Sequence, residues 1–187
     1  MVNLLIVLGA NIEATTKQLW TPLHFATWHN EKAILVTLLE HGANAEARRE
    51  DGYTALHYAA AADNEEMVCL LLEHGAELEA RVTGSHKTAL HLAAEKGNDR
   101  IVKLLIERGA DVQACDREDK TALQLAAESA FCGTVRKQYI SSIFKRYHRV
   151  TAYPNGGLGI PKVSSKSSLN ALNSAMKPVW KYQTYKY

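Results

Sequence analysis

The 187-residue sequence has few cysteines, no long hydrophobic run and no basic leader. Its three cysteines, Cys69, Cys115 and Cys132, are odd in number and include no CxxC pair, which argues against a disulfide framework or a zinc site. No apolar run approaches the roughly 18 residues that a membrane-spanning helix needs. The apolar start MVNLLIVLGAN lacks a basic region and a cleavage site. We therefore expect an intracellular protein, in the cytoplasm or nucleus, that is neither secreted nor membrane-spanning.

The sequence also lacks the motifs of the common enzyme classes. It contains no GxSxG, HExxH, Walker or kinase signature. The adjacent carboxylates Glu65-Glu66 and Glu118-Asp119 stand where surface turns are expected, so a solvated face is the better interpretation than a catalytic pair. We expect no catalytic residue, no cofactor, no metal and no small-molecule substrate.

Acidic residues are absent from the last third of the chain. Residues 1–128 contain all 20 Asp and Glu and 12 Lys and Arg, a net charge of −8. Residues 129–187 contain 10 Lys and Arg and no acid, a net charge of +10, and six of the eight tyrosines. This break indicates two regions with different physical properties.

A short motif recurs four times with nearly constant spacing. TPLHFA begins at Thr21, TALHYA at Thr54, TALHLA at Thr88 and TALQLA at Thr121, which are 33, 34 and 33 residues apart. Gly-Ala pairs that begin at residues 9, 42, 75 and 109 keep the same step. The hexapeptide motif and the Gly-Ala pair each occur four times and keep the same spacing. Their shared register indicates an internal repeat.

The residues within each repeat predict two helices. The motif threonines suit helix N-caps, and Pro22 suits a first helical position. The leucine and alanine at the third and sixth motif positions share one helical face, where small alanine lets helices approach closely. A second apolar stripe with steps of three and four follows in each unit, and Gly42, Gly75 and Gly109 end it. The stripe consists of Ile34, Leu35, Leu38, Leu39, Met67, Val68, Leu71, Leu72, Ile101, Val102, Leu105 and Ile106.

The period and the T-P-L-H-x-A core resemble the ankyrin repeat over about residues 1–128. The resemblance implies an all-α solenoid of stacked helix-turn-helix units with short β-hairpin fingers. Each unit is too small to bury its own apolar face, so stacked neighbours form one continuous core. Leu19, His86 and Asp119 replace the usual finger glycine, and the finger geometry of the family is not carried over to these three positions.

The repeat register predicts an ankyrin-repeat domain over residues 1–148 and a separate tail. The units are a partial N-terminal repeat 1–16, repeats at about 17–49, 50–83 and 84–116, and a degenerate capping repeat 117–148. In the last unit, residues 134–147 keep an amphipathic pattern, which favours a helix that caps the stack over a separate binding helix. Residues 149–187 are a basic, Ser- and Tyr-containing tail with Pro and Gly punctuation and no sustained period, so we expect it to be mostly disordered.

The first residues align with the second helix of a repeat, because Gly9 takes the place of Gly42. Val7 and Leu8 then occupy positions that are polar elsewhere. Since terminal repeats normally present a polar outer face, this start suggests a fragment of a larger ankyrin-containing protein, a truncated gene model or an edge covered by a partner.

Three of the eight histidines occupy one motif position, as His24, His57 and His91, with Gln124 in the fourth copy. The resemblance implies that these histidines make structural hydrogen bonds between repeats. A metal site would need the three rings to converge, which residues one repeat apart do only in a specific geometry.

In proteins that resemble this one, partners usually dock on the concave face formed by finger tips and first helices. The finger positions here are Lys17, Gln18, Trp20, Glu50, Asp51, Tyr53, Ser85, His86, Lys87, Arg117, Glu118 and Lys120. The positions late in the first helices are Trp28, His29, Glu95 and Lys96, with Ala61, Ala62 and Glu128 at equivalent places. Trp20, Trp28 and Tyr53 stand out, because aromatic residues dominate interface hot spots. Packing of the three rings on their own fingers is the alternative.

We therefore predict a non-catalytic adaptor or scaffold that binds a protein partner on its concave face. The rival hypothesis is a charge-driven binder of nucleic acid or anionic membrane that uses residues 129–187. Ten positive charges with interleaved aromatics suit phosphates, but they are spread along the chain rather than clustered.

Overall fold

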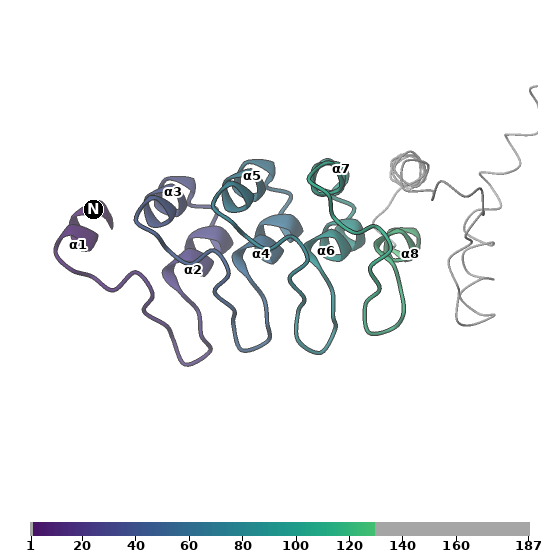
Figure 1. The fold of residues 1–187 in the computed structure, drawn as a ribbon, viewed down its shortest axis with the longest axis horizontal. Helices are drawn as coiled ribbons and strands as arrows, with labels where there is room; N and C mark the ends of the chain where they lie inside the picture. Colours follow the sequence, from purple (N-terminus) through teal and green to yellow (C-terminus); the bar gives the residue numbers. More distant parts are fainter. Residues whose placement is uncertain (1, 130–187) are drawn as a thin grey trace, which may run out of the picture.

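The computed structural model describes residues 2–129, which contain eight α-helices and no sheet. Figure 1 shows the helices in two rows, with long loops extending from one side. The inner row consists of α2 (Pro22–Trp28), α4 (Ala55–Ala61), α6 (Ala89–Lys96) and α8 (Ala122–Glu128). The outer row consists of α1 (Val2–Val7), α3 (Lys32–Glu40), α5 (Glu65–Glu73) and α7 (Asp99–Glu107). The all-α repeat architecture is confirmed, while Cys132, the helix expected at 134–147 and the tail lie outside the described residues.

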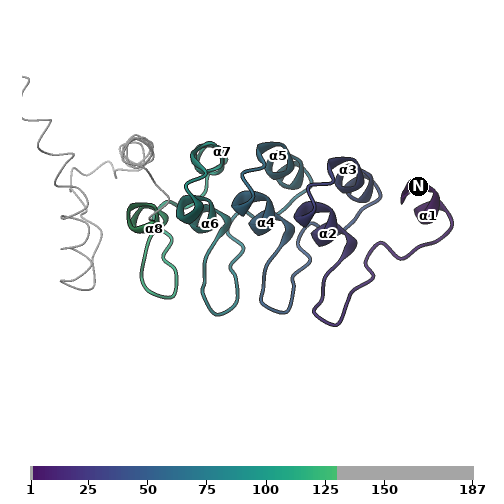
Figure 2. The same cartoon turned by 180° about the vertical axis from the view of Figure 1, so that it is seen from behind.

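The inner helices α2, α4 and α6 each pack against the outer helix that follows, and consecutive inner helices from α2 to α8 pack against one another. The view from behind shows the same order from α1 to α8 along one axis (Figure 2). No helix in residues 2–129 is long and apolar enough to cross a bilayer.

The four motif threonines begin the inner helices, which confirms the predicted N-caps. Thr21, Thr54, Thr88 and Thr121 have extended backbone, and their side chains cap the third helical residue. That residue reaches back to the threonine N–H, so two backbone donors are satisfied at once. The distance from the Thr54 nitrogen to His57 Nδ1, for example, is 3.2 Å.

The core lies between the two rows, where the motif leucines and alanines meet the outer stripe. Leu56 and Ala59 of α4 are fully buried, as are Val68 and Leu71 of α5. The alanine at the sixth motif position is buried in all four copies, so neighbouring inner helices approach closely, as the sequence predicted. The core therefore runs as one cluster from Leu23 to Ala126.

The long loops are the fingers, which we define as residues 10–21, 43–54, 76–88 and 110–121. Each closes through a backbone hydrogen bond across its turn, such as the one from the Arg49 nitrogen to the Tyr53 oxygen at 2.9 Å. The resemblance predicted short β-hairpins in the fingers. Within residues 2–129 the structure instead has one isolated β-bridge, between Cys115 and Thr121. The fingers turn after too few residues for a ladder to extend, so they are hairpin-like loops without strands.

Neighbouring fingers are linked by backbone hydrogen bonds. The Thr83 nitrogen donates to the Asp51 oxygen at 2.9 Å, and the Arg117 nitrogen donates to the Ser85 oxygen at 2.9 Å. The turn residue two places before the threonine has positive φ in every finger, whether it is Leu19 (60°), Gly52 (79°), His86 (55°) or Asp119 (57°). The missing glycines therefore leave the finger geometry unchanged, at the cost of left-handed backbone in L-residues.

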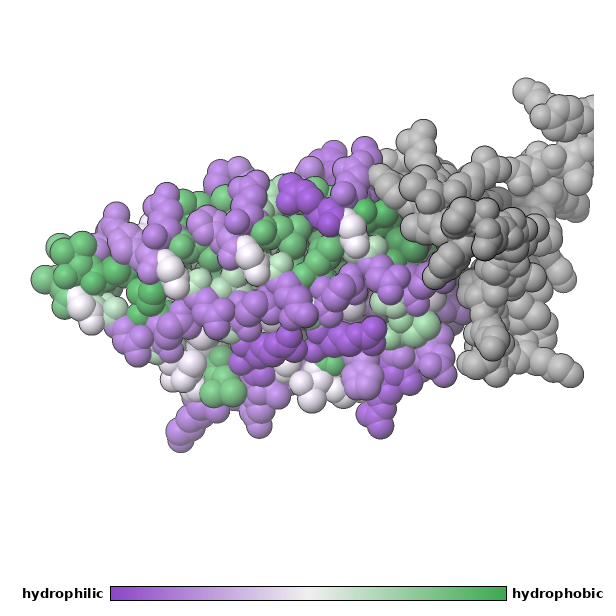
Figure 3. Space-filling model, in the orientation of Figure 1, coloured by the Kyte–Doolittle hydropathy of each residue, from purple (hydrophilic) through white to green (hydrophobic). Residues whose placement is uncertain are grey.

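The stack has an apolar end at α1. Leu4, Leu5, Val7 and Leu8 are exposed there. Figure 3 shows the same feature as a gathering of hydrophobic colour at the tip of the molecule where α1 lies.

Candidate partner-binding groove

A groove of about 810 Å³ runs along the stack where the fingers meet the inner helices. Its lining consists of Trp20, Trp28, Arg49, Asp51, Tyr53, Tyr58, Ala61, Ser85, Lys87, Leu92, Glu95, Lys96, Leu125, Glu128 and Ser129. These residues come from four consecutive units, so stacking builds the groove rather than any single unit.

Three sequence positions, counted from each motif threonine, account for most of the groove. The residue four places after the threonine forms the floor, as Tyr58, Leu92 and Leu125 do. The residue just before the threonine forms the finger wall, and the residue seven places after it forms the helix rim. The wall positions are Trp20, Tyr53, Lys87 and Lys120, and the rim positions are Trp28, Ala61, Glu95 and Glu128.

The end of the groove nearest α2 is aromatic. The Trp20 ring stacks on Tyr58 with centroids 5.4 Å apart and on Phe25 at 4.9 Å. It meets Trp28 edge-on at 5.9 Å, and Tyr53 lies 5.3 Å from Tyr58. Such ring pairs stabilise beyond the area that they bury. Trp20 is thus a packing residue at the centre of the cluster, whereas Trp28 has 60% of its surface exposed.

Arg49 inserts its guanidinium group into this aromatic cluster. Its Cζ lies 4.4 Å from the centre of the Trp20 ring and 5.9 Å from that of Tyr58. Its Nη1 donates to the Tyr58 hydroxyl and lies 3.2 Å from Asp51 Oδ2. Its Nε is buried and has no hydrogen-bond partner among the described residues. The arginine therefore combines a cation–π contact with an incompletely satisfied guanidinium.

The end of the groove nearest α8 is ionic. The Lys87 ammonium lies 2.9 Å from Glu95 Oε2, across the groove from finger wall to helix rim. The Lys120 ammonium lies 2.7 Å from Glu128 Oε2 and 3.0 Å from Glu118 Oε2. The hydrogen bonds that Lys120 donates to the carboxylates of Glu128 and Glu118 raise its pKa. Each wall lysine here is neutralised by a carboxylate of its own chain.

The three motif histidines lie beneath the groove and link consecutive units. Each is fully buried, and each accepts at Nδ1 from its own N-cap threonine. The opposite nitrogen of His57 lies 3.1 Å from the Ala80 oxygen and 3.3 Å from the Lys87 oxygen, both in the next finger. His24 reaches the Tyr53 oxygen at 3.2 Å and His91 reaches the Lys120 oxygen at 3.2 Å.

These contacts fix the neutral ring with its proton on Nε2, because Nδ1 already faces two donors from the threonine. Burial lowers the pKa of all three histidines, and that of His57 to about 4. The three rings bond to different carbonyls one repeat apart. In residues 2–129, no group of three or more His, Cys, Asp or Glu side chains is arranged to hold a metal ion.

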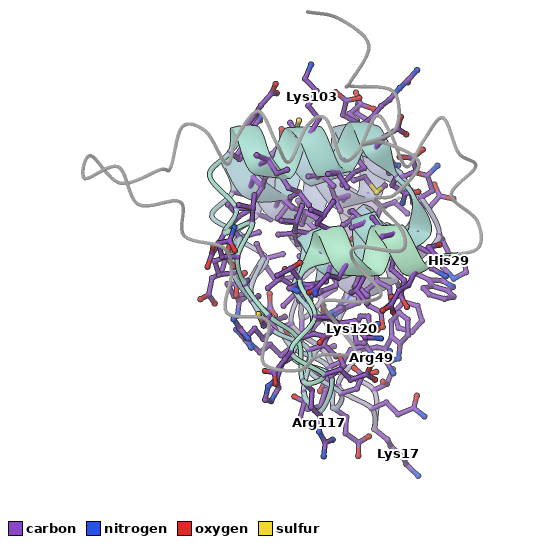
Figure 4. The ribbon with its side chains drawn as sticks, turned by 90° about the vertical axis from the view of Figure 1, so that its right-hand side faces the viewer. Lys17, His29, Arg49, Lys103, Arg117 and Lys120 are labelled. Carbon is purple, nitrogen blue, oxygen red and sulfur yellow. The ribbon has the colours of Figure 1, made fainter. Side chains whose placement is uncertain are left out.

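Half of the sixteen residues expected to bind a partner line the groove. They are Trp20, Trp28, Asp51, Tyr53, Ser85, Lys87, Glu95 and Lys96. The other eight are Lys17, Gln18, His29, Glu50, His86, Arg117, Glu118 and Lys120, of which all but Lys120 are exposed. Figure 4 shows Lys17 and Arg117 at the finger tips and Lys103 at the opposite edge, on α7. The groove therefore lies below the finger tips, against the inner helices.

Sequence reasoning missed five lining residues of the groove, Arg49, Tyr58, Leu92, Leu125 and Ser129. Tyr58, Leu92 and Leu125 occupy the fifth letter of the motif, which varies as F, Y, L and L while the sixth letter is always alanine. That apolar but variable position was a usable signal. Arg49 carried no such signal, because only the fold brings it against Trp20 of the preceding finger.

The family model for ankyrin repeats, described as three copies, matches residues 1–82 and again residues 79–137. These matches cover most of the chain, which therefore belongs to the ankyrin-repeat family. No curated protein matches the chain. Ankyrin repeats are generally protein–protein interaction modules, and the family is typically non-catalytic.

Proposed function

We propose that this ankyrin-repeat protein is a non-catalytic adaptor whose groove binds a segment of a protein partner. The ankyrin-repeat domain of residues 1–148 would act as the rigid part, and the tail of residues 149–187 would lie outside the binding surface. Specificity would come from the side chains at the wall, floor and rim positions, because the helix backbone is the same in every unit.

The observation that carries the proposal is the aromatic end of the groove. Trp28 is 60% exposed and Phe25 is 42% exposed, although both contact the ring of Trp20. Exposed large rings beside a packed cluster are typical of interface anchors, since they bury a large rigid area on binding. The cluster beneath them holds the rings in place, so little side-chain entropy is lost when a partner docks.

The charges of the groove favour a protein segment over a nucleic acid. Its charged lining residues are Arg49, Lys87 and Lys96 against Asp51, Glu95 and Glu128, so the lining carries no net charge. Phosphate-driven binding needs several uncompensated cations. The rival hypothesis, a basic binder of nucleic acid or anionic membrane, rests on residues 129–187, of which only Ser129 is described.

A random 12-residue peptide library displayed on phage, selected on the full-length chain, tests the proposal. Selected peptides are then measured by fluorescence anisotropy against wild type and Trp28→Ala. We expect Trp28→Ala to weaken binding by about 2 kcal/mol or more, with unchanged helical circular dichroism. Lys103→Ala, on the opposite edge of the stack, is the control and should bind like wild type. Selected peptides that bind Trp28→Ala as tightly as wild type would contradict the proposal.

A further inference from the structure

The second finger differs from the first and fourth at the position five residues before the motif threonine. In the first and fourth fingers this position supplies an acceptor for the finger itself. Thr16 Oγ1 accepts from the Trp20 nitrogen at 3.2 Å, and Asp116 Oδ1 accepts from the Lys120 nitrogen at 3.0 Å. In the second finger the position is Arg49, which has no acceptor to offer and turns toward Trp20 and Tyr58 instead. The side chain of Arg49 therefore accepts no hydrogen bond within its own finger, where it pairs only with Asp51.

One edge of the Arg49 guanidinium remains without a hydrogen bond. Nη1 makes both polar contacts, with the Tyr58 hydroxyl and with Asp51. Nε is buried and unpartnered, and within residues 2–129 no group accepts from Nη2. Nε and Nη2 together form the side of a guanidinium that takes a carboxylate through two parallel hydrogen bonds. Arg49 lines the groove while its Nε is covered, so a partner carboxylate would pair with this edge once the side chain turns toward the groove.

The other charged residues of the groove lining also indicate that the uncompensated charge there is positive. All three lining carboxylates are already engaged by cations of the chain: Asp51 by Arg49, Glu95 by Lys87 and Glu128 by Lys120. Among the lining cations, Arg49 keeps a free edge and Lys96 has no ion-pair partner in the described part of the chain. Unused charge in the groove is thus positive, although the repeat region as a whole is acidic.

We propose that Arg49 recognises an acidic side chain of the partner segment, an Asp or Glu adjacent to an apolar residue that packs on Trp28. This inference rests on the proposed function and specifies its partner. Arg49 and Trp28 both flank the Trp20 ring, at 4.4 Å and 5.9 Å from its centre, so one short segment reaches both. Trp20 and Tyr58 lie against the guanidinium and leave it partly desolvated, which strengthens a charge-assisted pair.

A basic or methylated side chain is a poorer occupant of the aromatic end. A cation binds an aromatic cluster through the ring faces, and Arg49 already covers a face of Trp20. A second cation would also meet the guanidinium charge. A carboxylate meets an attractive charge and completes the hydrogen bonds of Arg49.

The test uses the same peptide library, selected in parallel on full-length wild type, Arg49→Met and Lys103→Met. We expect wild type and Lys103→Met to enrich peptides with an acidic residue next to Leu, Phe or Trp. Arg49→Met should keep the apolar preference and lose the acidic one. Methionine has the length of the arginine stem without its charge, and Lys103→Met removes one positive charge from the far edge.

A double-mutant cycle then measures the pair directly. One selected acidic peptide and its Glu→Gln or Asp→Asn form are titrated against wild type and Arg49→Met. We expect the amide peptide to bind wild type about tenfold or more weakly, and Arg49→Met to bind both forms equally. The comparison of the two peptides on wild type needs no variant, so it remains decisive if Arg49→Met unfolds.

The outcomes separate this inference from the proposed function. Binding that is lost in Trp28→Ala but shows no acidic preference in wild type would overturn the role of Arg49 and leave the groove as the binding site. Binding that is unaffected by both Trp28→Ala and Arg49→Met would overturn both. Enrichment of basic peptides on wild type would also contradict the Arg49 assignment.

Discussion

The two ends of the groove use the same three positions in each unit but fill them with different chemistry. At the α2 end, wall and rim residues are Trp20 and Trp28, whose rings meet at 5.9 Å. At the α8 end the equivalent residues are Lys120 and Glu128, whose charged atoms meet at 2.7 Å. Both pairs join a finger to the end of an inner helix, yet the aromatic pair removes apolar area from water while the ion pair keeps its charges partly solvated.

The difference shows that the repeat backbone determines which positions come into contact. The side chains at those positions determine how much each contact contributes to stability and to binding. Exposed ion pairs contribute little, because solvent and salt screen them. Rings that pack on one another contribute both stability and a rigid binding surface. Stability and specificity should therefore concentrate at the aromatic end. The following predictions test equivalent positions in different units, in decreasing order of effect.

The largest contrast is expected between Trp20→Ala and Lys87→Ala, which alter the same wall position. Trp20→Ala removes a ring that contacts Phe25, Trp28, Tyr58 and Arg49, and it should lower the free energy of unfolding by about 2–4 kcal/mol. Lys87→Ala removes one partly exposed ion pair and should cost under about 1 kcal/mol. Urea unfolding monitored by circular dichroism measures both. Equal losses of unfolding free energy in the two variants would show that the aromatic end is no more stabilising than the ionic end.

The second prediction concerns pH and the motif histidine. Burial lowers the pKa of His57 to about 4 in the folded state, against about 6.5 for an exposed histidine, so the unfolded chain binds more protons between these two pH values. Its contribution is present above pH 6.5 and is lost as the pH falls toward 4, by up to about 3 kcal/mol. The lowered pKa values of His24 and His91 act in the same direction.

The fourth unit supplies the matched variant for this test. Gln124 takes the histidine position there and accepts from the Thr121 nitrogen at 2.8 Å without titrating. His57→Gln should therefore reduce the loss of unfolding free energy between pH 7 and pH 4.5. Urea titrations at both pH values measure the difference. An unchanged pH dependence in His57→Gln would contradict the assignment of acid sensitivity to this ring.

The third prediction compares two finger glycines with positive φ. A Cβ at Gly52 would lie 2.4 Å from Thr83 Oγ1 and 2.5 Å from the Thr83 nitrogen. A Cβ at Gly84 would have no described heavy atom within 4 Å, apart from the glycine itself and its two neighbours in the chain. Gly84→Ala should cost about 1 kcal/mol for the backbone alone. Gly52→Ala should cost about 2–3 kcal/mol, because the next finger must also move. Thermal unfolding of both variants measures the difference, and equal midpoints would contradict the close approach of the fingers.

The smallest effect is a gain in stability. Leu19 has a φ of 60° at the position that Gly52 occupies in the next finger. Leu19→Gly should relieve the left-handed strain and stabilise the fold by about 0.5–1 kcal/mol, after the greater freedom of the unfolded chain is subtracted. Asp119→Gly should gain less, because aspartate tolerates this conformation better. A loss of stability in Leu19→Gly, measured by urea unfolding, would show that the leucine side chain has a packing role.

Much of the fold could be predicted because the sequence of each repeat contains the local signals for its own helices and turns. Threonine N-caps, the apolar stripes and the terminal glycines all concern residues within about ten positions of one another, where helical geometry fixes the outcome. The histidine hydrogen bonds between units were expected only from the resemblance to the ankyrin family. Their return contact to the threonine N–H is local, yet it was missed, although a polar residue three places after an N-cap threonine is a known signal.

The candidate site could be predicted only in part. The wall and rim positions follow from the register, so Trp20, Trp28 and Lys87 were expected at a binding face. The sequence by itself thus determined the repeat, its helices and the wall and rim positions of each unit, because these depend on short-range geometry repeated every 33 or 34 residues. Only the tertiary structure decided that Arg49 stacks on Trp20 and that Tyr58 completes the cluster. The physical reason is that stacking brings together side chains one repeat apart, and the rotamers that they adopt there depend on the neighbouring unit rather than on their own.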